Sequence, residues 1–154
     1  MLLSSLLTTR PVLNSCLLLG LLLPTHGSAA DTSLEQRRTQ TDATFQAALD
    51  KLAQRCDELK LPKQAEQTRQ LQIVRRPDQQ VIFLPSRQDP LAPAANASQT
   101  VRFWHQELTR HRQTQAQELF ALVNPLLAAD RPAEAYRLLF ETLYHDPTHA
   151  EATK

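Results

Sequence analysis

Apolar residues between positions 45 and 59 recur at alternating spacings of four and three, which places them on one face of a helix. They are Phe45, Leu49, Leu52, Cys56 and Leu59. From Ser33 to Leu61 the chain has no proline or glycine, which favours a long helix. Pro62 suits a first helical position, so Lys63 to Leu71 is expected to form a short partner helix. Two heptads are too few for a coiled coil, so the pattern predicts an antiparallel helix pair.

A proline-bounded apolar run, Val81 to Leu84, interrupts the helical pattern. This run, about residues 80–84, is β-prone but has no second strand to pair with, so we expect it to lie extended along a helical surface. Ser86 to Ser98 contains Pro90, Pro93 and several alanines, which is typical of a linker. The chain therefore divides into an N-terminal helical region (31–76), an extended segment and linker (77–98) and a C-terminal helical region (99–154).

The C-terminal region is expected to begin a helix near Gln99, with a kink at Pro125. The apolar face of that helix carries Trp104, Leu108, Leu119, Leu122 and Leu126. Pro132 is expected to start another helix, which Asp146-Pro147 should stop. The apolar stripe of this second helix consists of Ala135, Leu138, Leu139, Thr142 and Leu143. We expect Trp104 to be a core residue that holds its helix to the Val81–Leu84 run. The predicted fold class is all-α, built of helical hairpins.

Residues 1–30 have the three parts of a secretory signal peptide. Arg10 precedes an apolar stretch from Val12 to Leu23, which is shorter than the roughly 20 residues of a membrane-spanning helix. Gly27-Ser28-Ala29-Ala30 supplies small side chains at the cleavage positions, so we expect cleavage before Asp31. An uncleaved anchor is the alternative. The chain is therefore predicted to be exported, either periplasmic or secreted.

The remainder of the chain is formally neutral. Removing residues 1–30 removes one of the 17 basic residues, Arg10, and none of the 16 acidic residues. Arg75-Arg76 and the Arg110–Arg112 pair are too short for basic tracts and are expected to be ordinary solvated residues. Nucleic acid is not an expected partner, because phosphate binding requires a basic face.

Both glycines, Gly20 and Gly27, lie in the signal peptide. Phosphate-binding loops, dinucleotide-binding turns and nucleophile elbows all need glycine, so none is expected in the remainder. Cys56 is then the single cysteine, and we expect it to be a small buried side chain on a helix seam. An intermolecular disulfide is the alternative.

Histidine spacing does not predict a metal site. His145 and His149 are separated as a helical pair would be, but Pro147 between them disrupts the helix. His105 and His111 do not share a helix face, and His111 is expected to be a packing or interface residue. No zinc motif or nucleophile motif occurs, so catalytic, cofactor-binding and metal residues are all predicted to be none.

The span from Ala116 to Pro147 resembles a tetratricopeptide repeat, a helix-turn-helix unit of about 34 residues. Anchored on Pro147, the resemblance places the small residue of the repeat at Ala135 and its large apolar residue at Leu139. Val123, Thr142 and Pro125 depart from the pattern. Thr148 to Ala152 resembles the opening of a next repeat. The chain is thus expected to be either a short form or the front part of a longer secreted bacterial protein.

These observations predict a non-enzymatic helical module that binds a protein or peptide partner in a groove formed by its hairpins. An N-terminal accessory region of a larger secreted enzyme is the alternative, with the catalytic domain outside this chain. Self-association through the Cys56 stripe is a third hypothesis. Stable membrane insertion after signal cleavage is not expected.

Overall fold

The computed structural model describes residues 29–73, 75, 79–86 and 88–154. Within these residues the protein is all-α and has no strand; four helices have nine residues or more, and one helical segment has six. They are α1 (Ala29–Glu58), α2 (Pro62–Gln70), α3 (Gln99–Phe120), α4 (Val123–Ala128) and α5 (Pro132–His145). The predicted signal peptide lies outside the described residues except for Ala29 and Ala30, which open α1.

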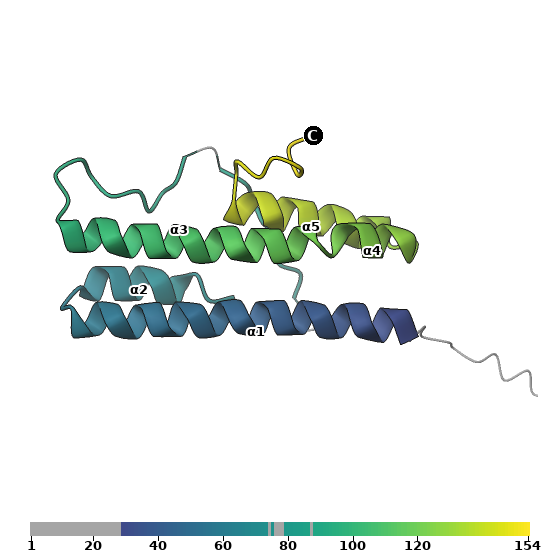
Figure 1. Ribbon diagram of the computed structural model, residues 1–154, viewed down its shortest axis with the longest axis horizontal. Coiled ribbons are helices and arrows are strands. Elements are labelled where there is room, and N and C mark those ends of the chain that lie inside the picture. Colours follow the sequence, from purple (N-terminus) through teal and green to yellow (C-terminus); the bar gives the residue numbers. More distant parts are fainter. Residues whose placement is uncertain (1–28, 74, 76–78, 87) are drawn as a thin grey trace, which may run out of the picture.

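The helices form two hairpins whose long members lie side by side in opposite directions (Figure 1). Hairpin 1 is α1 with α2, and hairpin 2 is α3 and α4 with α5. Near the start of α1, Leu34 packs with Leu122, which follows α3; farther along α1, Leu52 packs with Trp104 near the start of α3. Antiparallel packing therefore places α2 and α5 at opposite ends of the α1/α3 pair (Figure 1).

Two apolar clusters hold the hairpins together, one at each end of the α1/α3 pair. The first cluster contains Phe45, Leu49, Leu52, Cys56, Ala65, Trp104 and Leu108. The second contains Leu34, Leu119, Leu122, Val123, Leu126, Ala135 and Leu138. The predicted stripe on α1 is confirmed from Phe45 to Cys56, but the prediction for Leu59 is wrong. Leu59 is 43% exposed because α1 ends at Glu58 and the next residues turn into α2.

The same turn connects the helices within each hairpin, and it is built without glycine. Lys60 and Asp130 follow α1 and α4 with φ of 58° and 57°. The amide of the following residue donates to the carbonyl five residues earlier, from Leu61 to Cys56 at 2.8 Å and from Arg131 to Leu126 at 2.9 Å. This bond closes the helix end as a glycine-containing cap would. Pro62 and Pro132 then begin α2 and α5, as predicted.

The interruption predicted at Pro125 occurs just before it. α3 ends at Phe120, Ala121 and Leu122 form a turn, and α4 begins at Val123. A proline ring clashes with the carbonyl four residues earlier, which here belongs to Ala121, so the helix breaks at that residue. After α5 ends at His145, residues 147–153 form turns and no helix.

The extended run does not pack where the sequence suggested. Residues 79–86 have neither helix nor strand, and Phe83 is buried while its neighbours Ile82 and Leu84 are exposed. The Phe83 ring lies 5.2 Å from the Tyr144 ring and 6.2 Å from the His145 ring, so the run is attached to the end of α5. The predicted contact with Trp104 is wrong, because Trp104 lies inside the first cluster.

Trp104 is a core residue, as predicted, and it has a polar partner. Its indole Nε1 donates to Thr68 Oγ1 at 2.9 Å in a buried contact between α3 and α2. Thr68 Oγ1 donates in turn to the Gln64 carbonyl at 2.7 Å. Because a buried indole N–H without a partner is costly, this bond secures α2 against α3.

We predict that Thr68→Val destabilises the protein by about 2 kcal/mol, because it leaves the Trp104 N–H buried without an acceptor. Thr39→Val is the matched control, since Thr39 is exposed and donates the same kind of bond, to the Glu35 carbonyl at 2.9 Å. Urea unfolding followed by circular dichroism measures both variants. Equal stability of the two variants would contradict this role for the indole bond.

Candidate functional site: a charged cleft between the hairpins

A partly buried ion pair joins the two hairpins near their middle. Arg38 of α1 donates from Nη2 to both carboxylate oxygens of Glu141 of α5, each at 2.6 Å. The Glu141 side chain is 6% exposed and that of Arg38 is 16% exposed. The Arg38 Nη1 atom is buried and has no hydrogen-bond partner in the described part of the chain. The contact links two residues that are 103 positions apart in the sequence.

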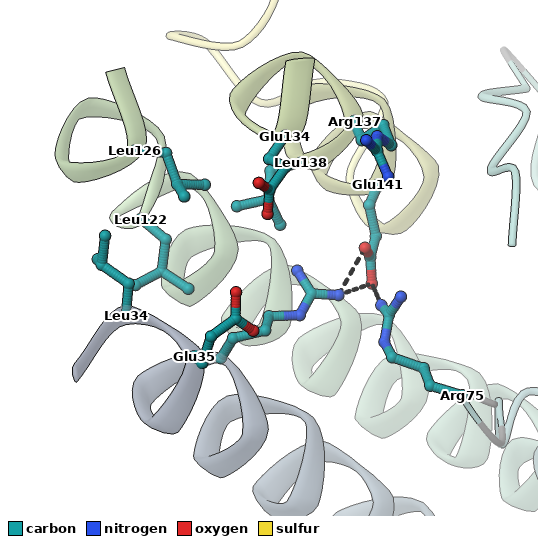
Figure 2. A pocket seen from close by; sticks show the side chains of 10 residues that line it. Leu34, Glu35, Arg75, Leu122, Leu126, Glu134, Arg137, Leu138 and Glu141 are labelled. Atoms are coloured by element: carbon teal, nitrogen blue, oxygen red, sulfur yellow. Dashed lines mark hydrogen bonds and ion pairs between the residues drawn. The ribbon is translucent and has the colours of Figure 1, made fainter. Parts of the chain in front are cut away.

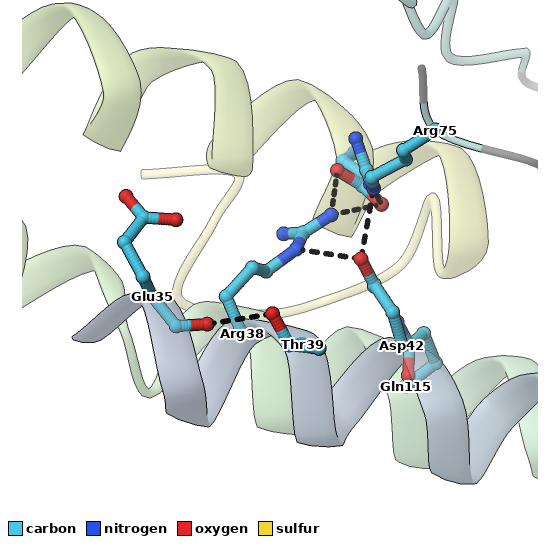
Figure 3. Close-up of polar contacts among 7 residues, drawn as sticks. Glu35, Arg38, Thr39, Asp42, Arg75 and Gln115 are labelled. Atoms are coloured by element: carbon cyan, nitrogen blue, oxygen red, sulfur yellow. Dashed lines mark hydrogen bonds and ion pairs between the residues drawn. The ribbon is translucent and has the colours of Figure 1, made fainter. Parts of the chain in front are cut away.

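Asp42 and Arg75 extend this pair into a network (Figure 3). Asp42 Oδ2 lies 3.1 Å from Arg38 Nε and 2.8 Å from Arg75 Nε, and Arg75 Nη2 donates to Glu141 Oε1 at 2.5 Å. Gln115 of α3 donates to Asp42 Oδ1 at 3.2 Å. Burial alone would lower the pKa of Arg75, but the charges of Glu141 and Asp42 raise it above its ordinary value. Arg75 is exposed, as expected, and it also takes part in the network through ion pairs with Asp42 and Glu141.

Beside the network, α1, α4 and α5 border an open cleft of about 220 Å³, here called the inter-hairpin cleft. Figure 2 shows leucines of α1 and of the α3/α4 end on one side and charged side chains of α5 across from them. The apolar lining is Leu34, Leu122, Leu126 and Leu138. The charged lining is Glu35, Arg38, Arg75, Glu134, Arg137 and Glu141. Both hairpins thus contribute to one amphipathic cleft.

The acids around the cleft already have arginine partners. Arg131 Nη2 lies 2.5 Å from Glu134 and 2.5 Å from Glu35, and hydrogen bonds with these two carboxylates raise the pKa of Arg131. Arg137 differs, because within the described residues its guanidinium donates only to the Ala133 carbonyl, at 3.3 Å, and forms no ion pair. Arg137 is consequently the cation at the cleft that is available to a ligand.

His145 lies in a ring cluster next to the network. Its ring is 4.9 Å from Phe45 and 5.2 Å from Tyr144, and its Nδ1 atom is buried with no partner in the part of the chain that is described. Burial and then the charges of Arg112, Arg38 and Arg75 lower its pKa to about 3. His145 is therefore neutral at pH 7.

The two histidines of the rejected metal pair face different neighbours. His149 packs on Phe120 with ring centroids 4.8 Å apart, whereas His145 faces Phe45 and Tyr144. Across the described ranges, no three His, Cys, Asp or Glu residues gather in a way that could hold a metal ion.

Cys56 is buried in the first apolar cluster, as predicted. Burial, and then the charge of Asp57, raises the pKa of its thiol, which favours the unreactive protonated form. The stripe to which it belongs is covered by α2 and α3 of the same chain. That surface is therefore not free for the self-association that the stripe suggested.

The segment predicted as a linker is attached to α3. Asp89 Oδ2 bonds to His105 Nε2 at 2.7 Å, and its other oxygen lies 3.5 Å from Arg112 Nη1. Burial would raise the pKa of Asp89, but the bonds from His105 and from the Leu91 amide hold it below its ordinary value. Arg112 also donates to the Tyr144 carbonyl at 2.6 Å, and its side chain is only 13% exposed, so the prediction that Arg112 is an ordinary solvated residue is wrong.

No protein-family model, curated protein or solved structure matches this chain. Among the helices that the structure describes, none combines the length and apolarity needed to cross a membrane.

Sequence reasoning did not identify the inter-hairpin cleft. One signal was present: Glu141 lies between Leu138 and Thr142 on the predicted apolar stripe of α5, and a carboxylate on a buried face requires a partner. The position of that partner, Arg38, is not encoded in any local pattern.

We predict that Glu141→Gln destabilises the protein by about 3 kcal/mol, because it leaves the charge of Arg38 buried without its main partner. Glu151→Gln removes the exposed ion pair with Lys154 and should cost less than about 1 kcal/mol. Chemical unfolding of both variants at pH 7 provides the comparison. A cost for Glu141→Gln as small as that for Glu151→Gln would show that the network does not stabilise the fold.

We predict that His145 makes the protein less stable as pH falls from about 6.5. The unfolded chain takes up a proton near pH 6.5, whereas folded His145 stays neutral down to about pH 3, so acid favours unfolding in that window. Between pH 7 and pH 4.5, His145→Phe should remove about 2 kcal/mol of the pH-dependent loss of stability. Tyr144→Phe alters the same ring cluster without removing a histidine and should keep the wild-type pH dependence. If the free energy of unfolding changed with pH in the same way for the wild type and for His145→Phe, this effect would be excluded.

Proposed function

We propose that the protein is an exported, non-enzymatic helical module that binds a protein or peptide partner through the inter-hairpin cleft. The observation that carries this proposal is the composition of the cleft, in which a leucine surface and a charged rim come from both hairpins. Export rests on the signal-peptide features of residues 1–30.

The size of the cleft favours a side-chain anchor over a whole small molecule. Its volume of about 220 Å³ is below the roughly 300–1,000 Å³ that is typical of small-molecule pockets. Leu34, Leu126 and Leu138 would contact an aliphatic side chain, and Arg137 would bind a neighbouring carboxylate. The ligand class proposed is therefore a peptide segment in which an aliphatic residue lies next to an acidic residue or a free C-terminus.

The architecture proposed for hairpin 2 is that of a tetratricopeptide-like unit. Supporting features are the buried Ala135 and the half-buried Leu139 at the positions where the repeat has its small and large apolar residues. Hairpin 1 has the same spacing from Pro62 to a buried alanine, Ala65, as hairpin 2 has from Pro132 to Ala135. Helical hairpins of this kind commonly present peptide-binding grooves.

Panning the purified protein against a displayed random peptide library tests the proposal. The expected result is enrichment of peptides that pair an aliphatic residue with an acidic one. Arg137→Ala should then weaken binding of an enriched peptide about 10-fold, the effect of losing one charged hydrogen bond. Arg110→Ala removes an exposed arginine on α3 that does not line the cleft and should leave binding unchanged.

Absence of any enriched sequence would reject the proposal. So would an enriched peptide whose affinity is the same for the wild-type protein and for Arg137→Ala.

A further inference from the structure

A second hollow lies between α1 and α3 and shares no residue with the inter-hairpin cleft. This hollow, here called the α1/α3 groove, has a volume of about 650 Å³ and continues into a neighbouring hollow of about 300 Å³ that reaches Glu118. At the middle of the groove the α1 wall consists of small residues and the α3 wall of larger ones. Its central lining is Ala43, Thr44, Ala47, Ala48, Phe103 and His111.

The walls of the groove suit an additional helix. Helix axes approach to about 8–10 Å, the distance depending on side-chain size, so the alanines of α1 permit close approach. Phe103 is 46% exposed, although the adjacent Trp104 is buried, so α3 offers an aromatic surface beside those alanines. From Gln40 to Arg55, α1 borders the hollows over roughly 22 Å, the length of a helix of about 15 residues.

Charge distinguishes the two ends of the groove. Lys51 and Arg55 lie one helical turn apart on α1, both line the groove, and neither forms an ion pair with a described residue. Like charges at this spacing repel each other. Glu118, at the other end, also forms no ion pair within the described ranges. Glu107 of α3 also lines the groove, but it is paired with Arg110 at 2.7 Å. Lys51 and Arg55 therefore leave a cationic end beside the apolar centre.

We propose that the α1/α3 groove binds an amphipathic helix of a partner protein, with acidic residues of that helix against Lys51 and Arg55. The small-residue face of α1 and the Phe103 ring contact the apolar side of the bound helix. The two cations determine which helices bind, because only an acidic end neutralises them.

Fluorescence anisotropy with two labelled 16-residue peptides tests this proposal. Both probes carry the same Ala/Leu face on a Gln background; one has three Glu residues in its first turn, and the other has three Lys residues there. The full chain should bind the acidic probe at least 10-fold more tightly than the basic probe. Combined Lys51→Glu and Arg55→Glu substitutions should reverse this preference.

Two further variants separate groove binding from non-specific attraction. Ala47 is exposed on α1, so Ala47→Trp should fill the groove without disturbing the fold and should weaken the acidic probe at least 10-fold. Combined Lys63→Glu and Lys154→Glu substitutions make the same change of net charge outside the groove and should change affinity less than 2-fold. Circular dichroism confirms that each variant keeps its helices.

Equal affinity for the two probes would overturn the proposal. So would unchanged affinity of Ala47→Trp for the acidic probe, or an equal loss of that affinity in the two double charge-reversal variants. Arg137→Ala should leave probe binding unchanged, because Arg137 lies in the other cleft. The two binding proposals can thus fail separately.

Discussion

The contact between Arg38 and Glu141 is the constraint on which the arrangement of the hairpins depends. Along α1, the two apolar clusters are separated by the polar layer that contains Arg38 and Asp42. Apolar surfaces tolerate sliding, whereas a buried carboxylate displaced from its arginine would bear the full cost of desolvation. The network therefore sets how far hairpin 2 extends along α1, and so which leucines form the inter-hairpin cleft.

Local patterns in the sequence predicted the helices well because local chemistry determines where they begin and end. Pro62 and Pro132 begin α2 and α5, and Asp146-Pro147 follows the last residue of α5. Spacing of apolar residues identified most of the buried positions for the same reason, since one helix face must be covered. The prediction that Leu59 belongs to the packed stripe was wrong because periodicity alone does not show that the helix has already ended.

Contacts between distant segments could not be predicted in this way. The sequence suggested that Phe83 and its neighbours contact Trp104, but Phe83 packs against α5 instead. Apolarity favours burial of a side chain, but it does not show which residues of a run are buried or against which element they pack. The cleft was missed for the same reason, since its lining comes from α1, the α3/α4 end, α5 and Arg75.

The network also limits what the inter-hairpin cleft can bind. Arg38 and Arg75 line the cleft, yet a ligand carboxylate could use them only by displacing Glu141, at the cost of leaving that carboxylate buried and unpaired. Arg131 is held by two glutamates in the same manner. Arg137 forms no ion pair with a described residue, so a carboxylate could bind there without disturbing the contacts that position the hairpins. In the proposed function, the fold thus depends on Arg38 and Arg75, and ligand binding depends on Arg137.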